Sequence, residues 1–315
     1  MGVFHFTGSR GRIRAVFSAA VLAGAIGAAG ALPGTFLTGY AGTGADQKAA
    51  SGAASAVSAS DLPAGVTAAE VKITDDMKYA GNSAIKSGSA ILYRNRDGAH
   101  GSTVVCVNAG HGTKGGGSAK TLSHPDGTPK VTGGTTAAGA VKSTAVSSGM
   151  EFPDGTPESS VNLKTAQLLR RELLKRGYSV LMIREGSDVQ LDNIARTVLA
   201  NRYADCHVAI HFDSTSSDKG AFFMSVPDAM KGMEPVASTW KKSEAFGTSV
   251  IDGLKKRDVK IFSGGSMDMD LTQTAYSSIP SIDLELGDKK TDHGDESLRR
   301  FAAGAADGIE AYFAE

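Results

Sequence analysis

Short apolar runs alternate with helical periods along most of this 315-residue chain, and this alternation constrains its fold more than any other feature. Residues 103–108, 178–183 and 206–212 are apolar runs of the length expected for buried strands. Apolar residues at helical spacing lie between them, in residues 157–176 and 191–203. Strand, helix and strand in succession predict an α/β fold with a mostly parallel sheet and helices on both faces.

The same alternation continues toward the carboxyl end of the chain. We expect strands at 220–226 and 280–286, a helix within 236–256 and a last helix at about 296–313. The apolar fraction of 41% is enough for a buried core, and we find no internal repeat and no second core. The sequence therefore predicts a single domain over residues 102–315, with its chemistry beyond the carboxyl ends of the strands.

The ends of the helix at 157–176 carry recognisable signals. Thr156 is a good N-cap, Pro157 suits the first helical position, and Gly177 can take the left-handed conformation that ends a helix. A helix that starts here turns the carboxylate of Glu158 toward the sheet and not into water. The expected buried stripe consists of Leu163, Ala166, Leu169 and Leu173.

The first 41 residues do not belong to the predicted domain. Arg10, Arg12 and Arg14 precede an uncharged stretch at 15–32, and small residues follow it. This pattern predicts a signal peptide over residues 1–41, with an N-terminal membrane anchor as the alternative. Either interpretation makes the protein secreted or associated with the cell envelope.

Two further segments precede the predicted domain. Residues 42–65 are small, polar and aperiodic, which predicts a disordered linker. Residues 66–101 form a lead-in segment, in which a strand at 91–94 and the turn after it suggest a hairpin.

The charge balance excludes one class of partner. Lys plus Arg equals Asp plus Glu at 33 each, and there is no basic run. No global field therefore favours nucleic acid or an anionic membrane surface, and we expect no nucleic-acid partner.

Residues 110–115 match the dinucleotide-binding pattern G-x-G-x-x-G. That site needs a helix that begins inside the glycines and an acidic residue about twenty positions later. Here the next residues are rich in Gly, Thr and Pro, and the next helical pattern starts more than forty residues on. We therefore interpret the glycines as a turn that displays His111.

Three possible metal ligands are predicted to converge. His111 follows one buried strand and His211 ends another, and Cys106 and Cys206 each stand five residues before one of these histidines. If the strands are neighbours in parallel register, the cysteines pair across the sheet and the histidines meet at its carboxyl edge. Glu158 faces the same edge. Two imidazoles and one carboxylate suit Zn²⁺ and leave a fourth position for water.

Four motifs in this order carry a family resemblance. They are AGHG at 109–112, Glu158 with Asn162 four residues later, residues 191–213, and IPSIDLELGD at 279–288. Over about residues 103–313 the chain resembles the zinc-dependent N-acetylmuramoyl-L-alanine amidases of bacterial cell walls. The resemblance implies that His111, Glu158 and His211 bind zinc and that Glu285 is the catalytic glutamate.

The resemblance also implies a reaction and a partner. The substrate would be peptidoglycan, and the scissile bond the amide between N-acetylmuramic acid and the L-alanine of the stem peptide. The chain departs from the family at Asn108, where an Asp is usual, and at Asp288, where Gly287 is often followed by Phe. A zinc peptidase on a related scaffold and a non-catalytic wall-binding or regulatory module remain the alternatives.

The segment between the first two candidate ligands, residues 113–155, is unusually long. Both of its ends are fixed near the metal, so we expect it to border the cleft as a wall or lid.

Several other polar residues are expected to be structural. We predict that His207 is structural, that His124 is a solvated loop residue and that His293 is exposed at the surface. Asp283 shares the face of Glu285 and is expected to have a structural hydrogen-bonding role. Cys106 and Cys206 are expected to be buried thiols. The residues interpreted as scaffold are Asn162, Arg196 and Asn201.

Overall fold

The structure is a computed structural model that describes residues 62–314, all within one compact unit. The predicted signal peptide or anchor at 1–41, and all but the last residues of the linker at 42–65, lie outside the described residues. Within the described part of the chain, no helix is both long and apolar enough to span a bilayer.

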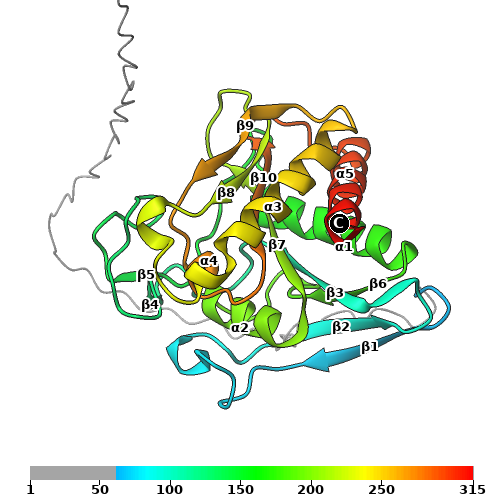
Figure 1. The fold of residues 1–315 in the computed structure, drawn as a ribbon. Helices are drawn as coiled ribbons and strands as arrows, with labels where there is room; N and C mark the ends of the chain where they lie inside the picture. Colours follow the sequence, from blue (N-terminus) through cyan, green and yellow to red (C-terminus); the bar gives the residue numbers. More distant parts are fainter. Residues whose placement is uncertain (1–61, 315) are drawn as a thin grey trace, which may run out of the picture. The chain divides into compact units, whose positions relative to one another are not determined.

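An eight-stranded sheet forms the centre of the fold (Figure 1). Its strand order is β1-β2-β6-β3-β7-β10-β8-β9. The strands are β1 (Val66–Val71), β2 (Ala90–Asn95), β6 (Tyr178–Met182), β3 (His100–Ala109), β7 (Cys206–Asp213), β10 (Ser281–Asp288), β8 (Ala221–Ser225) and β9 (Ile261–Asp268).

The sheet is mixed but mostly parallel, as the alternation of elements predicted. β3 pairs in parallel with both β6 and β7, β7 pairs in parallel with β10, and β8 with β9. The antiparallel pairs are β1 with β2, β2 with β6, and β8 with β10. The parallel centre consists of β6, β3, β7 and β10, and two of these strands, β7 and β10, hold His211 and Glu285.

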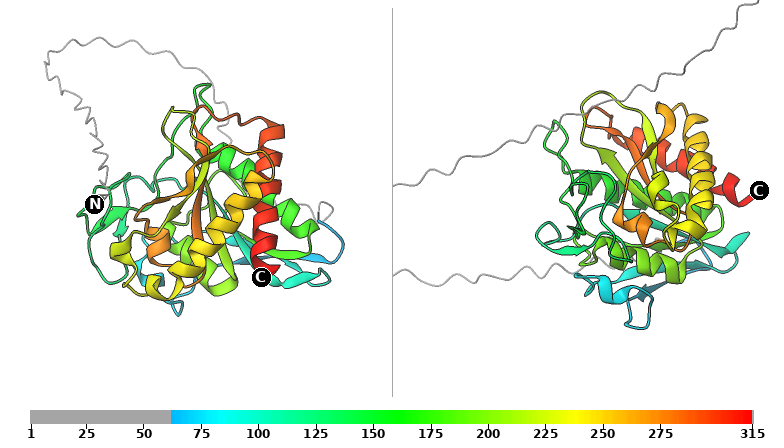
Figure 2. Two further views of the ribbon diagram at one scale, coloured as in Figure 1. Left: turned by 45° about the horizontal axis from the view of Figure 1, so that its top comes forward. Right: turned by 60° about the vertical axis from the view of Figure 1, so that its left-hand side comes forward.

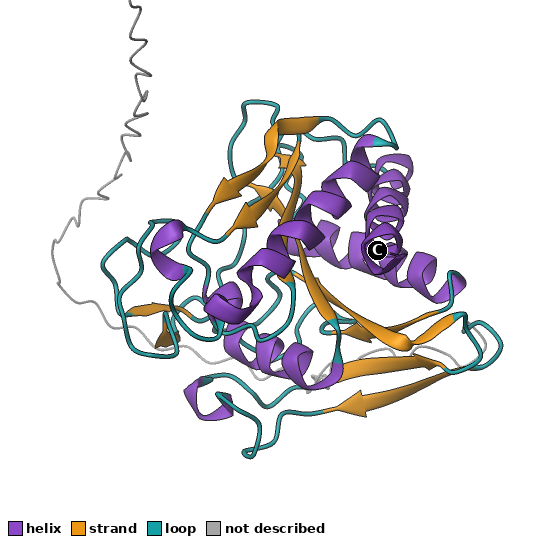
Figure 3. Ribbon diagram, in the orientation of Figure 1, coloured by secondary structure: helices purple, strands orange, loops and turns teal. Residues whose placement is uncertain are grey.

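Helices cover both faces of the sheet (Figures 2 and 3). Three long helices pack together on one face: α1 (Glu158–Lys175), α3 (Val236–Lys255) and α5 (Asp295–Ala314). The other face is covered by α2 (Asn193–Tyr203) and the short α4 (Thr272–Ala275). Two single turns of 3₁₀ helix lie at Ala80–Asn82 and Asp228–Met230. Each face has its own buried apolar cluster, so the layers are those of an α/β fold.

The lead-in segment extends the sheet at one edge. Its antiparallel pair is β1 with β2. The turn after β2 leads directly to β3, but β2 pairs with β6, which lies between β2 and β3 in the sheet. The turn therefore connects two strands that do not pair with each other.

The register of β3 and β7 differs from the prediction for the cysteines. The strands are parallel neighbours, but Cys206 stands opposite Val105, and Cys106 opposite His207. A shift of one residue puts the two thiols on opposite faces, because successive side chains alternate. Cys206 packs in the cluster beneath α1, and Cys106 in the cluster beneath α2. Both are buried free thiols, which confirms that part of the prediction.

Helix α1 begins one residue later than the sequence suggested. Pro157, with an extended backbone, occupies the N-cap position and makes no side-chain cap, so Thr156 is not the cap. The carbonyl of Thr156 instead accepts from Phe152. Gly177 ends the helix with a left-handed φ of 92°, as predicted. Of the expected stripe, Ala166, Leu169 and Leu173 are buried, whereas Leu163 is only partly buried.

The segment at 113–155 contains a small sheet of its own, formed by β4 (Lys120–Leu122) and β5 (Lys142–Thr144). The segment lies to one side of the main sheet, near α2 and α4 (Figure 1). Residues 113–155, hereafter the insertion, are therefore ordered and contain local structure that the sequence pattern does not indicate.

Candidate active site

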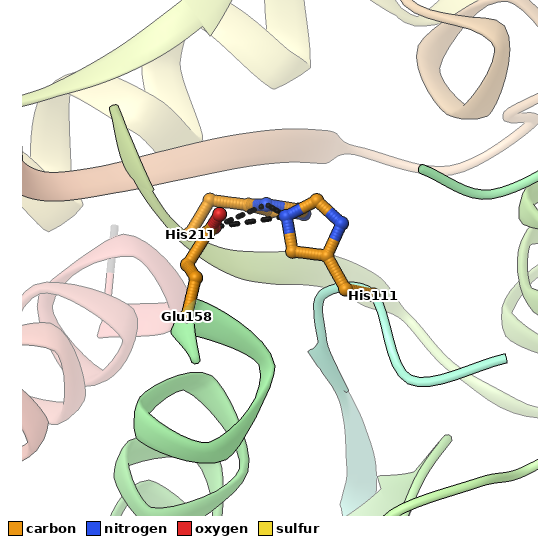
Figure 4. A group of neighbouring side chains, drawn as sticks. All are labelled: His111, Glu158 and His211. Carbon is orange, nitrogen blue, oxygen red and sulfur yellow. Dashed lines mark hydrogen bonds and ion pairs between the residues drawn. The ribbon is translucent and has the colours of Figure 1, made fainter. Parts of the chain in front are cut away.

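Three side chains from distant parts of the chain converge at the carboxyl edge of the sheet (Figure 4). His111 Nε2 lies 2.9 Å from Glu158 Oε1. His211 Nδ1 lies 3.1 Å from both of those atoms. Within the described residues, these three form a group that could hold a metal ion, with one ligand atom from each. The predicted convergence is therefore present.

The glycines around His111 serve close packing. His111 has a left-handed φ of 62°, and its ring lies edge-to-face beside that of His211, with the ring centroids 4.6 Å apart. A Cβ on Gly110 would lie 2.2 Å from the ring of His211, and Gly112 packs against Arg184 with a φ of 70°. The glycines that match the dinucleotide-binding pattern at 110–115 thus form the turn that brings the two imidazoles together.

The other ring nitrogen of His111 is also engaged. Its Nδ1 lies 2.9 Å from the carbonyl oxygen of Ser147 and 3.1 Å from the hydroxyl of the same residue. A carbonyl only accepts, so Nδ1 carries the proton, and Nε2 presents its lone pair to the cluster. Burial and the neighbouring His211 lower the pKa of His111, against the pull of Glu158. The insertion thereby fixes the tautomer of one candidate ligand.

Glu158 is the first residue of α1 and is only 3% exposed. Its Oε1 accepts from the backbone N–H of Phe212 at 3.1 Å and from the amide of Asn162 at 3.2 Å. Its Oε2 accepts from the backbone N–H of Met150 at 2.9 Å. Burial alone would raise the pKa of Glu158, but its contacts with the rings of His111 and His211 hold that pKa well below its usual range. Glu158 is therefore a fixed carboxylate.

His211 lies near the end of β7 and carries the positive charge of the cluster in the absence of a cation. Burial would lower its pKa, but Asp283 and Glu158 outweigh burial and raise it to about 9. Two ring nitrogens and a carboxylate oxygen about 3 Å apart repel one another unless a proton or a cation lies among them. The cluster is therefore built around positive charge.

Glu285 stands beside the cluster on β10. It is the parallel register partner of His211, and it is 9% exposed. Its Oε2 is buried and has no hydrogen-bond partner among the described residues. Burial and the nearby carboxyl of Asp283 raise the pKa of Glu285 well above its usual value. A carboxyl with a raised pKa holds a proton more readily than an ordinary glutamate, which suits it to act as a general acid and base.

A cavity of about 480 Å³ opens onto the cluster and Glu285. One side is formed by the ends of β7 and β10 and by the loop that leads to α4. The insertion forms the opposite side through Lys130, Gly134, Thr135, Thr136, Ser143, Thr144, Val146, Ser147, Ser148, Gly149 and Met150. The insertion therefore borders the site, as predicted.

A buried ionic clamp holds the insertion in place. His124 is 1% exposed, and its Nε2 lies 3.0 Å from both carboxylate oxygens of Asp270. Lys130 Nζ contacts the same residue, and the N–H of Val131 donates to Asp270 Oδ2 at 2.7 Å. The prediction of a solvated His124 is thus wrong. The sequence does not reveal a partner 146 residues away.

Two buried arginines hold the site together, and one of them, Arg184, lies outside the motifs found in the sequence. Arg184 donates to the carbonyls of Ala109, Gly110 and Ser159, and so joins the end of β3 to the start of α1. Its one sequence signal is a charge placed directly after a buried strand. Arg196 donates to the carbonyl of His111 and to other groups of this turn. The scaffold role expected for Arg196 is therefore confirmed.

The remaining scaffold predictions are also confirmed. Asn162 contacts Glu158, and the amide of Asn201 donates to the carbonyl of Tyr276. The side-chain oxygen of Asn108 accepts from Arg196 at 3.1 Å.

Three other polar residues can now be placed. His207 is fully buried, as a structural residue should be, and its Nδ1 lies 3.2 Å from the hydroxyl of Ser281. His293 is half-buried, because its ring packs on Phe152. Asp283 lines the cavity, and its buried Oδ1 has no hydrogen-bond partner among residues 62–314, so the structural hydrogen bond expected for Asp283 is not present there.

A group that can hold a metal ion, beside an unpaired carboxyl at the rim of an α/β sheet, is typical of metal-dependent hydrolases. The profile of the N-acetylmuramoyl-L-alanine amidase family matches residues 105–311, and the chain belongs to this family. It is accordingly a hydrolase with N-acetylmuramoyl-L-alanine amidase activity, and its substrate is peptidoglycan. Cell-wall amidases act outside the cytoplasm.

Solved structures support the fold. The amidase Ami1 from Mycobacterium smegmatis is 19% identical over 69% of this chain and 99% of its own, with a TM-score of 0.56. The apo form of Ami1 from Mycobacterium abscessus is 23% identical over 67% and 98%, with a TM-score of 0.53. AmiC2 of Nostoc punctiforme is 19% identical over 69% and 100%, with a TM-score of 0.50. The comparison with curated proteins gave no significant match.

Proposed function

We propose that His111, Glu158 and His211 bind a zinc ion and that Glu285 transfers the proton during amide hydrolysis. The observation that carries this proposal is the spacing of the three donor atoms, 2.9–3.1 Å. Bonds of 2.0–2.1 Å to a tetrahedral zinc ion would separate its ligands by ~3.3 Å. The donors thus need to move apart by only a few tenths of an ångström.

The donor set also suits a catalytic zinc ion. Three protein ligands leave a fourth position, and the cavity borders all three. When bound, zinc lowers the pKa of a coordinated water from about 16 to about 7 and can polarise a carbonyl. The tautomer of His111 is already fixed for this purpose by the carbonyl of Ser147.

Glu285 supplies the proton transfer. Its carboxylate takes a proton from the attacking water as the new C–O bond forms at the lactyl carbonyl carbon. The protonated carboxyl then donates to the nitrogen of L-alanine as the C–N bond breaks. The products are the free lactyl carboxylate and a stem peptide with a free amine. The raised pKa of Glu285 supports this double role.

Metal analysis combined with Glu285→Gln tests these assignments. We expect about one zinc ion per chain in both proteins, because the substitution removes no ligand. Turnover on wall sacculi should fall by ~10²–10⁴-fold, since only proton transfer is lost. Glu172→Gln, on the opposite end of α1, should keep both the zinc and the turnover. A Glu285→Gln enzyme with full turnover would contradict the role of Glu285.

The products discriminate the amidase from a zinc peptidase. The proposed cleavage releases intact stem peptides that begin with a free L-alanine amine. Amines that first appear at other residues of the stem would show cleavage between amino acids instead.

We also propose that residues 1–41 direct export, as a cleaved signal peptide or a retained anchor. The uncharged stretch after three arginines supports this proposal. N-terminal sequencing of protein from the medium and from membranes discriminates the two: a cleaved signal leaves mature chains that begin near residue 42.

A further inference from the structure

The orientation of the His211 ring decides which of its nitrogens can bind a metal. Nδ1 faces the cluster and lies 3.1 Å from both His111 Nε2 and Glu158 Oε1. If Nδ1 gives its lone pair to a cation, the single proton of the neutral ring must sit on Nε2. An acceptor for that Nε2–H would fix the tautomer.

The backbone beside Nε2 offers no such acceptor. Gly110 packs against this edge of the ring, and a Cβ there would lie 2.2 Å from Nε2. Its polar atoms are already engaged, because its N–H donates to the carbonyl of Ile210 at 3.1 Å and its carbonyl accepts from Arg184 at 2.9 Å and from Asn162 at 3.5 Å. His211 therefore lacks the kind of carbonyl that holds His111.

A carboxylate lies on this side instead. Asp283 Oδ2 is 3.7 Å from His211 Nε2, and this ion pair is the one polar contact of the Asp283 side chain within residues 62–314. Asp283 is 7% exposed, and its Oδ1 is buried without a hydrogen bond. Burial of a carboxylate without a full set of hydrogen-bond partners costs free energy. Its position opposite Nε2 therefore indicates a role for it there.

We propose that Asp283 is a positioning residue that accepts the Nε2 proton of His211 and thereby presents Nδ1 to the metal. The inference rests on the proposed zinc site. A carboxylate behind a ligating imidazole fixes the ring and makes its metal-binding nitrogen more basic. Glu285, although it is the register partner of His211, makes no ion pair with it among the described residues. The two carboxyls of β10 thus have different tasks.

Zinc affinity of Asp283 variants, measured by competition with a chelator, tests the proposal. We expect Asp283→Asn, which keeps an acceptor oxygen but no charge, to weaken zinc binding by ~10-fold, and Asp283→Leu by up to ~100-fold. Glu285→Gln removes a carboxyl from the same cavity and strand without touching Nε2, so its zinc affinity should stay within about threefold of the parent. Equal losses in Glu285→Gln and Asp283→Asn would overturn the proposal, and so would no loss in Asp283→Leu.

A second readout separates positioning from a general structural effect. In the zinc-loaded enzyme with ¹⁵N-labelled histidine, long-range ¹H–¹⁵N spectra should show the proton of His211 on Nε2. Asp283→Leu should change the Nε2–H shift of His211 and leave that of the His111 Nδ1–H in place. Unchanged His211 signals would overturn the proposal.

The failure of the zinc site itself has a different signature. If the unaltered protein binds no zinc, the proposed function fails together with this inference. If it binds zinc and Asp283→Leu binds it equally well, the zinc site stands and only the role of Asp283 is lost. Loss of folding is checked by the melting temperature of the metal-free variants, in which the ion pair of Asp283 with His211 is the one polar contact that the substitution removes among residues 62–314.

Discussion

Glu285 stands directly opposite His211 on neighbouring parallel strands, so the two side chains lie on one face at the carboxyl edge of the sheet. This relationship brings the proposed proton-transfer residue beside a proposed ligand through backbone pairing alone. A third group, Glu158, comes from the first turn of a helix, and its carboxylate is held by the N–H of Phe212, the residue after His211. The site is thus assembled by elements that the core already fixes.

Replacement of Gly149 by alanine should weaken the metal site without removal of any ligand. A Cβ at this position would lie 2.6 Å from His111 Cδ2 and 2.8 Å from Glu158 Oε2. We expect a loss of zinc affinity of ~10-fold or more, measured by competition with a chelator. Gly155→Ala is the control, because Gly155 has a similar φ of 82° with open space around it. The control should lose ~1–2 kcal/mol of stability and no zinc affinity.

His207 should make stability depend on pH. Burial, followed by the charge of Arg196, lowers its pKa to about 3 from an ordinary value of 6.5. Between these values the unfolded chain binds a proton that the folded chain does not. The stability that depends on a neutral His207 is therefore complete above pH 6.5. Below that value, the free energy of unfolding falls by about 1.4 kcal/mol per pH unit toward pH 3. Urea unfolding of the metal-free protein should show a steeper pH dependence than that of His207→Gln. Equal slopes would refute this assignment.

The ionic clamp beneath the insertion should be a large source of stability. Asp270→Asn leaves the buried Lys130 with no counter-charge and replaces one of the two oxygens that His124 contacts. We expect a loss of ~3–5 kcal/mol in the free energy of unfolding, or local opening of residues 113–155 at a smaller cost. Limited proteolysis reveals such opening. The exposed pair of Asp218 with Lys260 offers the comparison, because Asp218→Asn should cost less than ~1 kcal/mol.

Zinc should stabilise the folded chain. The three donors come from the ends of β3 and β7 and the start of α1, so an ion among them joins both strands to the helix layer. At a free zinc concentration 100-fold above the dissociation constant, the gain is ~2.7 kcal/mol. Thermal unfolding with zinc and with a chelator measures it. His111→Ala should abolish the difference, and a shift that survives this substitution would place the zinc elsewhere.

The α/β layers were predictable from local signals, and the three candidate ligands from such signals together with the family resemblance. Continuous apolar runs identify the strands, and a polar residue directly after such a run lies at the functional edge. The register was not predictable. Strands buried on both faces have no alternation to fix it, and so Cys106 and Cys206 fall on opposite faces instead of side by side.

The parts of the site that were not predicted depend on contacts between distant residues. Nothing near His124 indicates that it meets Asp270. The alternation of Asp283 with Glu285 placed both on one face, but only the ring of His211 shows what Asp283 faces. Ser147 supports His111 from within a segment that has no apolar period.

The clamp has a consequence for how this segment is inherited. His124 and Lys130 belong to the insertion, whereas Asp270 lies outside it, just before α4. A homologue that lacked the segment but kept the aspartate would have a buried carboxylate without a positively charged partner. The three positions should accordingly be gained and lost together, and a chimera that exchanges this segment between enzymes must carry residue 270 with it.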